Sequence, residues 1–462
     1  MSKKWLRKAI LVSMCTLLFA GCSSTPSKKA EQPSSLKVMF HDENYFFQQY
    51  GDLFTMKNPN IEIQVISTNS MYNGEVKDYK KAFDEFVEKE QPDVIMLNQE
   101  NYTEYASNGK LTELDTLIQR DKYNTENIYP ALLEQLKEQG GGKLYGLAPT
   151  FYGSAIFYNV DLFKKYGVEI PHDGMTWQEL LDTARRFPTD GDEKTRIYGF
   201  GEQYSMQIND LAQSIASTEG LKAINPDTLK VTINTDSWKK AYQMAIDAID
   251  SKAVYNPKDN FNGGPMEEYY KSQPFIMGRM AMTMGSSYDL QNYKDAKTAI
   301  KDYKPFELGI VAGPVDPAAP DITRNTGVGE LFAIRANSPN TDAAWEFIKF
   351  INGDEFAKVK SRSMSNGLLS RMGYSTEYDG HSLEAFYKLK PDMKGSEWYG
   401  SEKIPNEFYD QYRPLLEKEI GLVVDKKKSL DEALKTIQEQ GQAALDKAIK
   451  EKASKKESDS TK

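Results

Sequence analysis

The strongest constraint on the fold is the alternation of two hydrophobic periods across residues 36–97. Apolar side chains alternate with polar ones in short runs and recur every third or fourth residue in the longer runs between them, which is typical of strands and amphipathic helices. Five such segments follow one another: strand 36–40, a helix that ends at Asn58, strand 61–65, helix 77–89 and strand 92–97. A β-α-β-α-β order predicts a mostly parallel sheet with helical crossovers, so we expect an α/β fold.

Polar residues follow each of these strands. In open α/β sheets, ligands bind beyond the carboxyl ends of the strands. Carboxylate, amide and phenol groups at such ends can form hydrogen bonds with a small solute. We therefore expect ligand contacts among Glu43, Asn69, Tyr72, Asn98 and Gln99.

Residues 143–159 contain two aromatic-rich apolar runs of strand length, with Pro149 and Gly153 between them. Proline fixes its own φ angle and restricts the preceding residue, whereas glycine adopts φ angles closed to other residues. A joint that is rigid at one end and free at the other suits a hinge between two lobes. A tight hairpin inside one domain has the same pattern, and these residues alone do not separate the two interpretations.

The first 21 residues have the pattern of a secretory signal. A positive segment that ends at Lys8 precedes an apolar run over residues 9–20, which is shorter than the ~20 residues that span a bilayer. Cys22 follows Gly21, and this arrangement resembles the lipobox of bacterial lipoproteins, although Phe19 stands where leucine is usual. The resemblance implies a lipid anchor on Cys22. An ordinary signal cut near Ala20, with Cys22 as a free thiol, is the alternative.

Composition excludes several classes of function. The net charge is −9, and four positive residues lie in the signal, so the mature chain is still more acidic and is a poor binder of nucleic acid. The mature chain holds one Cys and the separated His41, His172 and His381, so we expect no internal disulfide and no metal site. Residues 22–35 and 453–462 lack large apolar side chains, which predicts a flexible tether and a disordered tail.

A series of motifs runs through the chain in a familiar order. The segments are Pro92-Asp93-Val94, 109–114, 146–159, Thr176-Trp177-Gln178-Glu179-Leu180, 275–286, 327–334 and 340–348. Their order and spacing resemble those of the extracellular solute-binding lipoproteins of ABC importers, in the class that binds maltose and other oligosaccharides. The resemblance extends over roughly residues 36–449. One departure is Ser370, which stands before Arg371 where relatives commonly carry proline.

The resemblance implies a two-lobed periplasmic-binding-protein fold of type II, with a mostly parallel sheet in each lobe and a ligand cleft between them. It implies an N-terminal lobe of residues 36–147 and 286–337 and a C-terminal lobe of residues 152–280 and 341–450. The implied function is the capture of an extracellular carbohydrate by hinge closure and its delivery to a membrane permease. We accordingly expect a monomer on the outer face of the cell membrane, without cofactor or catalytic residues.

A sugar site needs aromatic rings for the apolar face of the sugar and a hydrogen-bonding group for each hydroxyl. Trp398 is the best aromatic candidate, because it lies in a polar segment flanked by glycine, whereas Trp177, Trp238 and Trp345 lie in helical patterns typical of packing. The other candidates lie just past the possible hinge, just past expected strands, just before the segment 327–334, or in the segment of Trp398. They are Tyr152, Gln203, Tyr204, Tyr288, Asp289, Asn325 and Tyr399.

Two other functions are compatible with the sequence. A glycosidase needs two carboxylates across a sugar bond, and 67 acidic residues leave such a pair open, although no nucleophile, phosphate-binding or zinc-protease motif is found. A binder of peptides, polyamines or a uronate could share the same fold. A uronate would need a cation, and Arg324 and Arg371 are the arginines near the candidate loops.

Overall fold

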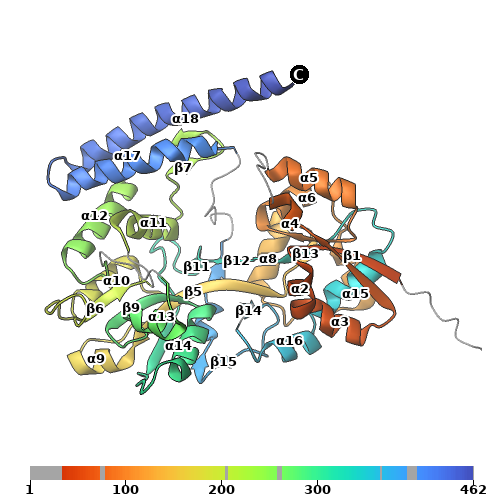
Figure 1. Ribbon diagram of the computed structural model, residues 1–462, viewed down its shortest axis with the longest axis horizontal. Helices are drawn as coiled ribbons and strands as arrows, with labels where there is room; N and C mark the ends of the chain where they lie inside the picture. The colour runs from red at the N-terminus through yellow and green to blue at the C-terminus, as the bar shows by residue number, and fades with distance from the viewer. Residues whose placement is uncertain are drawn as a thin grey trace, which may run out of the picture. The chain divides into compact units, whose positions relative to one another are not determined.

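The computed structural model describes residues 34–72, 79–202, 206–256, 263–364, 367–392 and 403–460 (Figure 1). The chain divides into two compact units, residues 1–92 and 93–462. The two units are described separately below.

The first unit confirms the expected strand–helix alternation. Strands β1 and β2 pair in parallel, with Leu36 opposite Ile63, and a continuous helical segment (α2, η1 and α3) connects them. The rings of Phe40 on β1 and Phe46 on α2 are buried and pack edge to face at 5.5 Å, which anchors the helix on the strand. The elements are β1 (Ser34–Phe40), α2 (Glu43–Phe46), η1 (Phe47–Gly51), α3 (Asp52–Lys57), β2 (Ile61–Ser67), α4 (Asn69–Tyr72) and α5 (Tyr79–Glu90).

The second unit begins with strand β3 (Val94–Leu97), whose antiparallel partner is the distant strand β13 (Leu331–Ile334). Strand β13 also pairs antiparallel with β4 (Gly146–Leu147). All residues of these strands are buried. Five helices belong to this region. They are α6 (Gln99–Ser107), α7 (Leu114–Asp121), α8 (Pro130–Gln139), α15 (Thr341–Ile351) and α16 (Asp354–Lys360).

Strand β5 (Thr150–Asn159) is the long central strand of a second sheet (Figure 1). Its first half pairs with β12 and β14, and its second half pairs with β9 and β10. Strands β4 and β5 do not pair with each other: β4 pairs with β13 instead. The hairpin interpretation of residues 143–159 is therefore wrong, and the segment carries the chain from one sheet to the other. The partners are β6 (Tyr198–Gly201), β9 (Met280–Ser286), β10 (Leu308–Val311), β12 (Thr326–Gly327) and β14 (Leu368–Leu369).

The second sheet is more antiparallel than we expected. Strands β9 and β10 both run antiparallel to β5, while β6 runs parallel to β9. The reason is that β9 and β10 return along β5 after long excursions of the chain, and such distant partners leave no trace in the local period. The sheet is mixed, which corrects the expectation of a mostly parallel sheet at this place.

Helices cover this sheet with the tryptophans that the sequence assigned to packing. Trp177 lies edge-on to Phe200 of β6 at 5.7 Å and Trp238 is 1% exposed, so both are core residues as expected. Thr176 and Glu179 form a capping box, because the Thr176 hydroxyl accepts from the Glu179 N–H and the Glu179 carboxylate accepts from the Thr176 N–H. The helices are α9 (Val160–Tyr166), α10 (Trp177–Ala184), α11 (Ile208–Thr218), α12 (Asp236–Asp250), α13 (Met266–Ser272) and α14 (Ser287–Ala299).

Helix α15 packs on β13, and two of its side chains contact Asp121 at the end of α7. The Trp345 indole N–H donates to Asp121 Oδ2 at 2.9 Å, and Lys349 Nζ lies 2.7 Å from the same oxygen. The second segment of the predicted C-terminal lobe begins at residue 341, yet these contacts join α15 to a helix of the predicted N-terminal lobe. The lobe boundaries stay predictions, and the contacts favour a later start for the C-terminal segment.

The chain ends in two long helices that lie side by side, α17 (Asn406–Val424) and α18 (Leu430–Ser460) (Figure 1). Helix α18 begins at a capping box formed by Ser429 and Glu432. It continues to Ser460, so the tail from residue 453, which we expected to be disordered, is largely helical. Lysine, glutamate and alanine in this segment favour helix even without a core to pack on.

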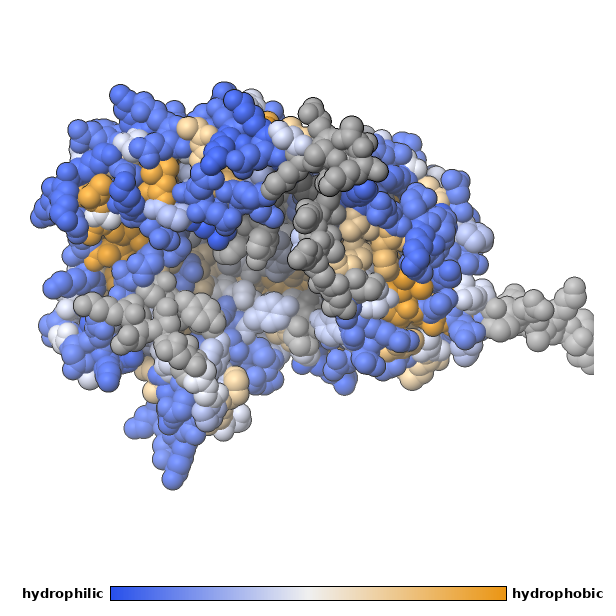
Figure 2. Space-filling view, turned by 45° about the horizontal axis from the view of Figure 1, so that its top comes forward, coloured by the Kyte–Doolittle hydropathy of each residue, from blue (hydrophilic) through white to orange (hydrophobic). Residues whose placement is uncertain are grey.

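Short elements complete the second unit. They are three two-stranded pairs and one 3-10 helix. Strand β7 (Ile224–Asn225) pairs with β8 (Lys230–Val231), β11 (Ile322–Thr323) with the distant β17 (Lys390–Pro391), and β15 (Glu377–Tyr378) with β16 (His381–Ser382), and the helix is η2 (Glu384–Phe386). Figure 2 shows one face of the molecule, on which hydrophilic residues predominate and hydrophobic residues gather in small areas. Within the described ranges, every helix is too short or too polar to cross a membrane.

Candidate functional site

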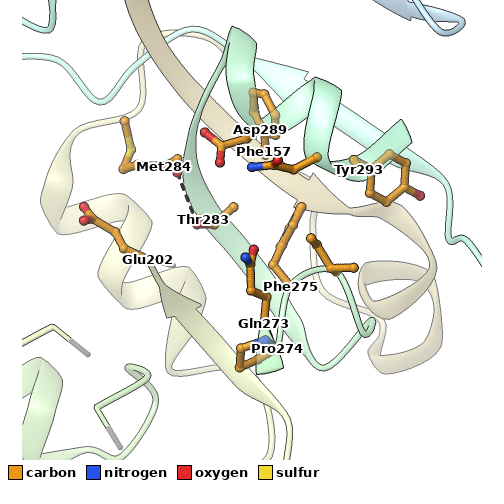
Figure 3. Close-up of a pocket in the computed structure, with 11 residues that line it drawn as sticks. Phe157, Glu202, Gln273, Pro274, Phe275, Thr283, Met284, Asp289 and Tyr293 are labelled. Carbon is orange, nitrogen blue, oxygen red and sulfur yellow. Dashed lines mark hydrogen bonds between the residues drawn. The ribbon is translucent and has the colours of Figure 1, made fainter. Parts of the chain in front are cut away.

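A small cavity lies beside strand β9 of the second unit, between the end of β6, the start of α14 and residues 273–276 (Figure 3). Its volume is ≈ 40 Å³, which is room for a few water-sized groups and not for a sugar ring. Both aromatic and hydrogen-bonding side chains line it. They are Phe157, Glu202, Gln273, Phe275, Thr283, Asp289, Asn292 and Tyr293.

Asp289 is held in the cavity wall by the start of α14. Its Oδ2 accepts from the Ser286 N–H at 2.7 Å and from the Ser286 hydroxyl at 2.8 Å, so the two residues form a capping box. A carboxylate at a helix start is stabilised by the free N–H groups and the dipole of the helix. The local sequence therefore fixes an acidic group at this wall, and Asp289 is both a predicted site residue and a lining residue.

Glu202 is the second acidic group of the cavity and directly follows strand β6. Burial, together with the smaller effect of the negative charges of Asp210 and Asp289, raises the pKa of its carboxyl to about 7. Glu202 forms no hydrogen bond or ion pair with another residue that the structure describes. A carboxyl in this state exchanges its proton near neutral pH and can act as donor or acceptor toward a ligand.

Tyr152 and Tyr288 are predicted site residues that keep about half of their surface exposed, 45% and 50%. Tyr152 lies on β5 opposite Gly327 of β12, and Tyr288 lies in the first turn of α14 next to Asp289. Burial of part of each ring raises the pKa of both phenols, so both stay protonated donors at neutral pH. Exposed rings of this kind are suitable for stacking on a ligand.

The other predicted residues are spread over the chain. Asn325 is partly buried just before β12, and its N–H donates to the Thr323 hydroxyl at 3.2 Å. Asn98 caps α6 by accepting from the Asn101 N–H at 2.8 Å, and Gln99 follows it as the first helical residue. Glu43 and Asn69 are exposed first residues of α2 and α4 in the first unit. As ligand contacts, these residues remain predictions.

Five predicted residues cannot be placed. Gln203, Tyr204, Trp398, Tyr399 and the lipid-anchor residue Cys22 lie outside the described residues, and so does the side chain of Tyr72.

The structure adds lining residues that the sequence analysis missed. Glu202 could have been found, because it directly precedes the predicted Gln203 in the sequence. Gln273, Phe275, Asn292 and Tyr293 come from a loop and from the interior of a helix. No local pattern marks them, since only the folding of residues 273–276 against β9 and α14 brings them to one cavity.

The two arginines considered for a uronate ligand are occupied within the protein. Arg324 donates to Asp392 Oδ2 at 3.1 Å and to the Thr218 carbonyl at 2.7 Å. Arg371 is 3% exposed and donates to the Asn352 carbonyl at 2.6 Å and to the Tyr123 hydroxyl at 3.0 Å. In the described part of the chain, no three His, Cys, Asp or Glu side chains are grouped so that they could hold a metal ion.

Comparison with known proteins identifies a family and several relatives. A family model described as bacterial extracellular solute-binding protein matches residues 32–358. The chain is 23% identical over 458 residues to the arabinooligosaccharide-binding protein of Bacillus subtilis, which covers 96% of this chain and 97% of that protein. It is 25% identical over 302 residues to the sn-glycerol-3-phosphate-binding periplasmic protein of Escherichia coli, covering 63% of this chain and 64% of that protein.

A solved structure with a similar fold is an ABC substrate-binding protein from Listeria monocytogenes in complex with cycloalternan. The TM-score is 0.55 at 20% identity, with 89% of this chain and 98% of that chain covered. This similarity confirms the expected two-lobed periplasmic-binding-protein fold. The family model spans well over half of the chain, from the start of β1 into α16. The chain therefore belongs to the bacterial extracellular solute-binding protein family.

Proposed function

We propose that this solute-binding protein captures an extracellular carbohydrate, most simply an oligosaccharide, and delivers it to the permease of an ABC importer. The relatives named above support the carbohydrate, because one is named for arabinooligosaccharides and another was solved with cycloalternan. In this proposal the protein binds and releases its ligand without chemical change.

The observation that carries the proposal is the composition of the cavity wall and its surroundings. Aromatic rings and hydrogen-bonding groups, among them two carboxyl groups, line it together, and Tyr288 stands exposed beside it. Aromatic faces stack on the apolar CH face of a sugar, while amide, hydroxyl and carboxyl groups satisfy its hydroxyls. The cavity is smaller than a sugar ring, so it would hold one substituent of a ligand whose main body lies outside it.

The charge of the cavity disfavours anionic ligands. Glu202 and Asp289 are acidic, and the described lining residues include no lysine or arginine. A uronate or a phosphate ester would meet repulsion there, and Arg324 and Arg371 are held by internal partners. We therefore do not propose a phosphate ester as the ligand, although the chain is similar to a glycerol-phosphate-binding protein.

Three further features belong to the proposal. The lipid on Cys22 would hold the protein, as a monomer, at the outer face of the membrane, with residues 22–35 as a tether. The N-terminal lobe would consist of residues 36–147 and 286–337. The C-terminal lobe would consist of residues 152–280 and 341–450, except that its second segment would start later, beyond α15. A ligand that contacts both lobes would favour the closed state, since those contacts exist only on closure.

A thermal-shift screen against mono-, di- and oligosaccharides tests the proposal. A solute that binds the folded state raises the melting temperature in a concentration-dependent manner. Peptides, polyamines and uronates in the same screen test the competing ligand classes. Chromatography of the incubated oligosaccharide tests for a glycosidase, and the appearance of shortened product would refute a purely binding role.

A further inference from the structure

We propose that the cavity beside β9 receives the exocyclic hydroxymethyl group of a neutral sugar, such as the C6 group of a hexose, and that Gln273 donates a hydrogen bond to its oxygen. The inference rests on the proposed function and narrows the class of carbohydrate to sugars that carry such a group. Three features of the cavity support it: an amide donor without a partner, apolar walls, and a size that excludes a sugar ring.

The side-chain amide of Gln273 is a buried donor. The side chain is 8% exposed and lines the cavity, and its Nε2 has no hydrogen-bond partner in the described part of the chain. Figure 3 shows this amide directed from the 273–276 loop toward Thr283. A buried N–H group that forms no hydrogen bond destabilises the folded protein, so an oxygen atom of a bound molecule is favoured at this point.

The backbone holds Gln273 in place. Its N–H donates to the Tyr270 carbonyl at 3.2 Å, and its carbonyl accepts from the Met277 N–H at 3.0 Å. Gln273 is the C-cap of α13, and Pro274 directly after it has a fixed φ angle. The donor is therefore positioned by the protein itself, and binding does not have to order this loop.

An uncharged oxygen suits this donor better than an anion. Asp289 lines the same cavity, so a carboxylate or phosphate oxygen would approach a wall of its own charge. A hydroxyl carries no charge and can accept and donate at once. The Thr283 hydroxyl donates to the Met284 carbonyl at 3.3 Å (Figure 3), so its oxygen can accept from a ligand hydroxyl in turn.

The apolar walls suit a methylene group beside that hydroxyl. Phe157, Phe275 and Ile276 line the cavity, and Phe275 comes from the same loop as Gln273 (Figure 3). The ring of Phe306 lies edge-on to Phe275 at 5.2 Å and fixes it. A hydroxymethyl group offers a CH₂ to these side chains and an oxygen to the amide. A hydroxyl attached directly to a sugar ring offers only the oxygen.

The volume of the cavity agrees with a group of this size. It is ≈ 40 Å³. One water molecule needs about 10–15 Å³ on this measure, so the cavity accepts about two or three heavy atoms. The carbon and oxygen of a hydroxymethyl group fit within this volume, while the sugar ring that carries them stays outside.

Calorimetry with sugars that differ only at this group tests the inference on the unaltered protein. Two series each contain a hexose, its 6-deoxy form and the pentose that lacks the whole group: glucose, 6-deoxyglucose and xylose, and galactose, D-fucose and L-arabinose. Cellotriose and xylotriose extend the comparison to oligosaccharides. If the thermal-shift screen selects another sugar, that sugar and its 6-deoxy form join the series.

We expect at least one hexose or hexose oligosaccharide to bind ~10-fold or more tightly than its 6-deoxy form, because a site built to donate to a hydroxyl discriminates against a ligand without it. The pentose should lie between the two. It leaves room for a water molecule on the amide, whereas the methyl group of a 6-deoxy sugar displaces that water and supplies no acceptor.

Two variants assign the preference to the cavity. Gln273→Met keeps the length of the side chain and removes the amide, so the preference for the hexose over its 6-deoxy form should fall to within ~2-fold. Gln135→Met is the matched control. Gln135 is another partly buried glutamine, with an amide oxygen that has no partner among the described residues, but it lies on α8 and does not line the cavity. It should leave the preference unchanged, and melting curves of both variants check folding.

The outcomes separate the two proposals. If every sugar that binds does so as tightly in its 6-deoxy form, the hydroxymethyl inference is overturned and the carbohydrate function stands. If no sugar in the wider screen binds, both are overturned. A preference for the hexose that survives Gln273→Met would place recognition of the hydroxyl elsewhere and would also overturn the inference.

Discussion

The phenol ring of Tyr152 lies directly against Gly327, its partner residue on the antiparallel strand β12. A Cβ atom on Gly327 would stand 2.3 Å from the Tyr152 hydroxyl oxygen and 2.5 Å from its ring. The glycine therefore provides the space in which this half-exposed ring lies over the crossing strands. The position of a candidate ligand-stacking ring is thus set by a residue 175 positions later in the printed sequence.

Replacing that glycine should move the ring. We expect Gly327→Ala to lower ligand affinity by ~10-fold through displacement of Tyr152, on the scale of a lost aromatic contact. Gly329→Ala is the matched control, because a Cβ at Gly329 meets nothing within 4 Å. Calorimetry with the ligand identified in the screen measures both. Equal affinities of the two variants would show that the contact of Tyr152 with Gly327 does not matter for binding.

Removal of the aromatic rings themselves should weaken binding. Tyr152→Ala and Trp398→Ala are each expected to cost ~1–3 kcal/mol of binding free energy by loss of stacking area, with folding intact. Tyr374, which is 36% exposed, provides the control variant Tyr374→Ala. Unchanged calorimetric affinity in both Tyr152→Ala and Trp398→Ala would refute their assignment to the ligand.

The capping box at α14 allows structural and ligand roles to be separated. Ser286→Ala removes one bond of the cap and should cost ~1 kcal/mol of the free energy of unfolding, while ligand affinity stays unchanged. Asp289→Ala should cost a similar amount of stability and, in addition, lower ligand affinity. Urea unfolding and calorimetry measure the two quantities. Loss of affinity in Ser286→Ala equal to that in Asp289→Ala would mean that the carboxylate acts only by holding the helix.

Stability should depend on pH through Glu202. Its pKa of about 7 in the folded protein exceeds the ordinary value of 4.5, so the protonated form stabilises the fold. That contribution is fully present below about pH 4.5 and is lost as the pH rises through about 7. The difference in unfolding free energy between Glu202→Gln and the unaltered protein should therefore grow by ~2–3 kcal/mol, in favour of the variant, from pH 4.5 to 8. Glu134→Gln, at an exposed glutamate, should show no such trend.

The anchor is tested in the cell. Cys22→Ala removes the predicted lipid-attachment residue and should release the protein into the medium, because residues 23–35 have no large apolar side chain to hold a membrane. Fractionation followed by immunoblotting measures the distribution. Retention of Cys22→Ala on the membrane would contradict lipid anchoring through this residue.

The local features of the fold were predictable because each depends on neighbours in sequence. The parallel β1–β2 pair, the capping boxes at Thr176 and Ser429 and the burial of Trp177, Trp238 and Trp345 all follow from period, cap chemistry and helical spacing. The end of α18 was misjudged, because the absence of large apolar residues argues against a core and not against a helix.

The site was predictable only where its features depend on residues close together in sequence. The sequence by itself determined the α/β class, the motif order of a solute-binding family and the place of acidic Asp289 just past an expected strand, since these depend on residues within a few positions of one another. Only the tertiary structure decided that Glu202, Gln273 and Tyr293 share one cavity and that Tyr152 lies over Gly327. Those neighbours are distant in sequence, and packing of separate strands and loops, rather than any local pattern, brings them together.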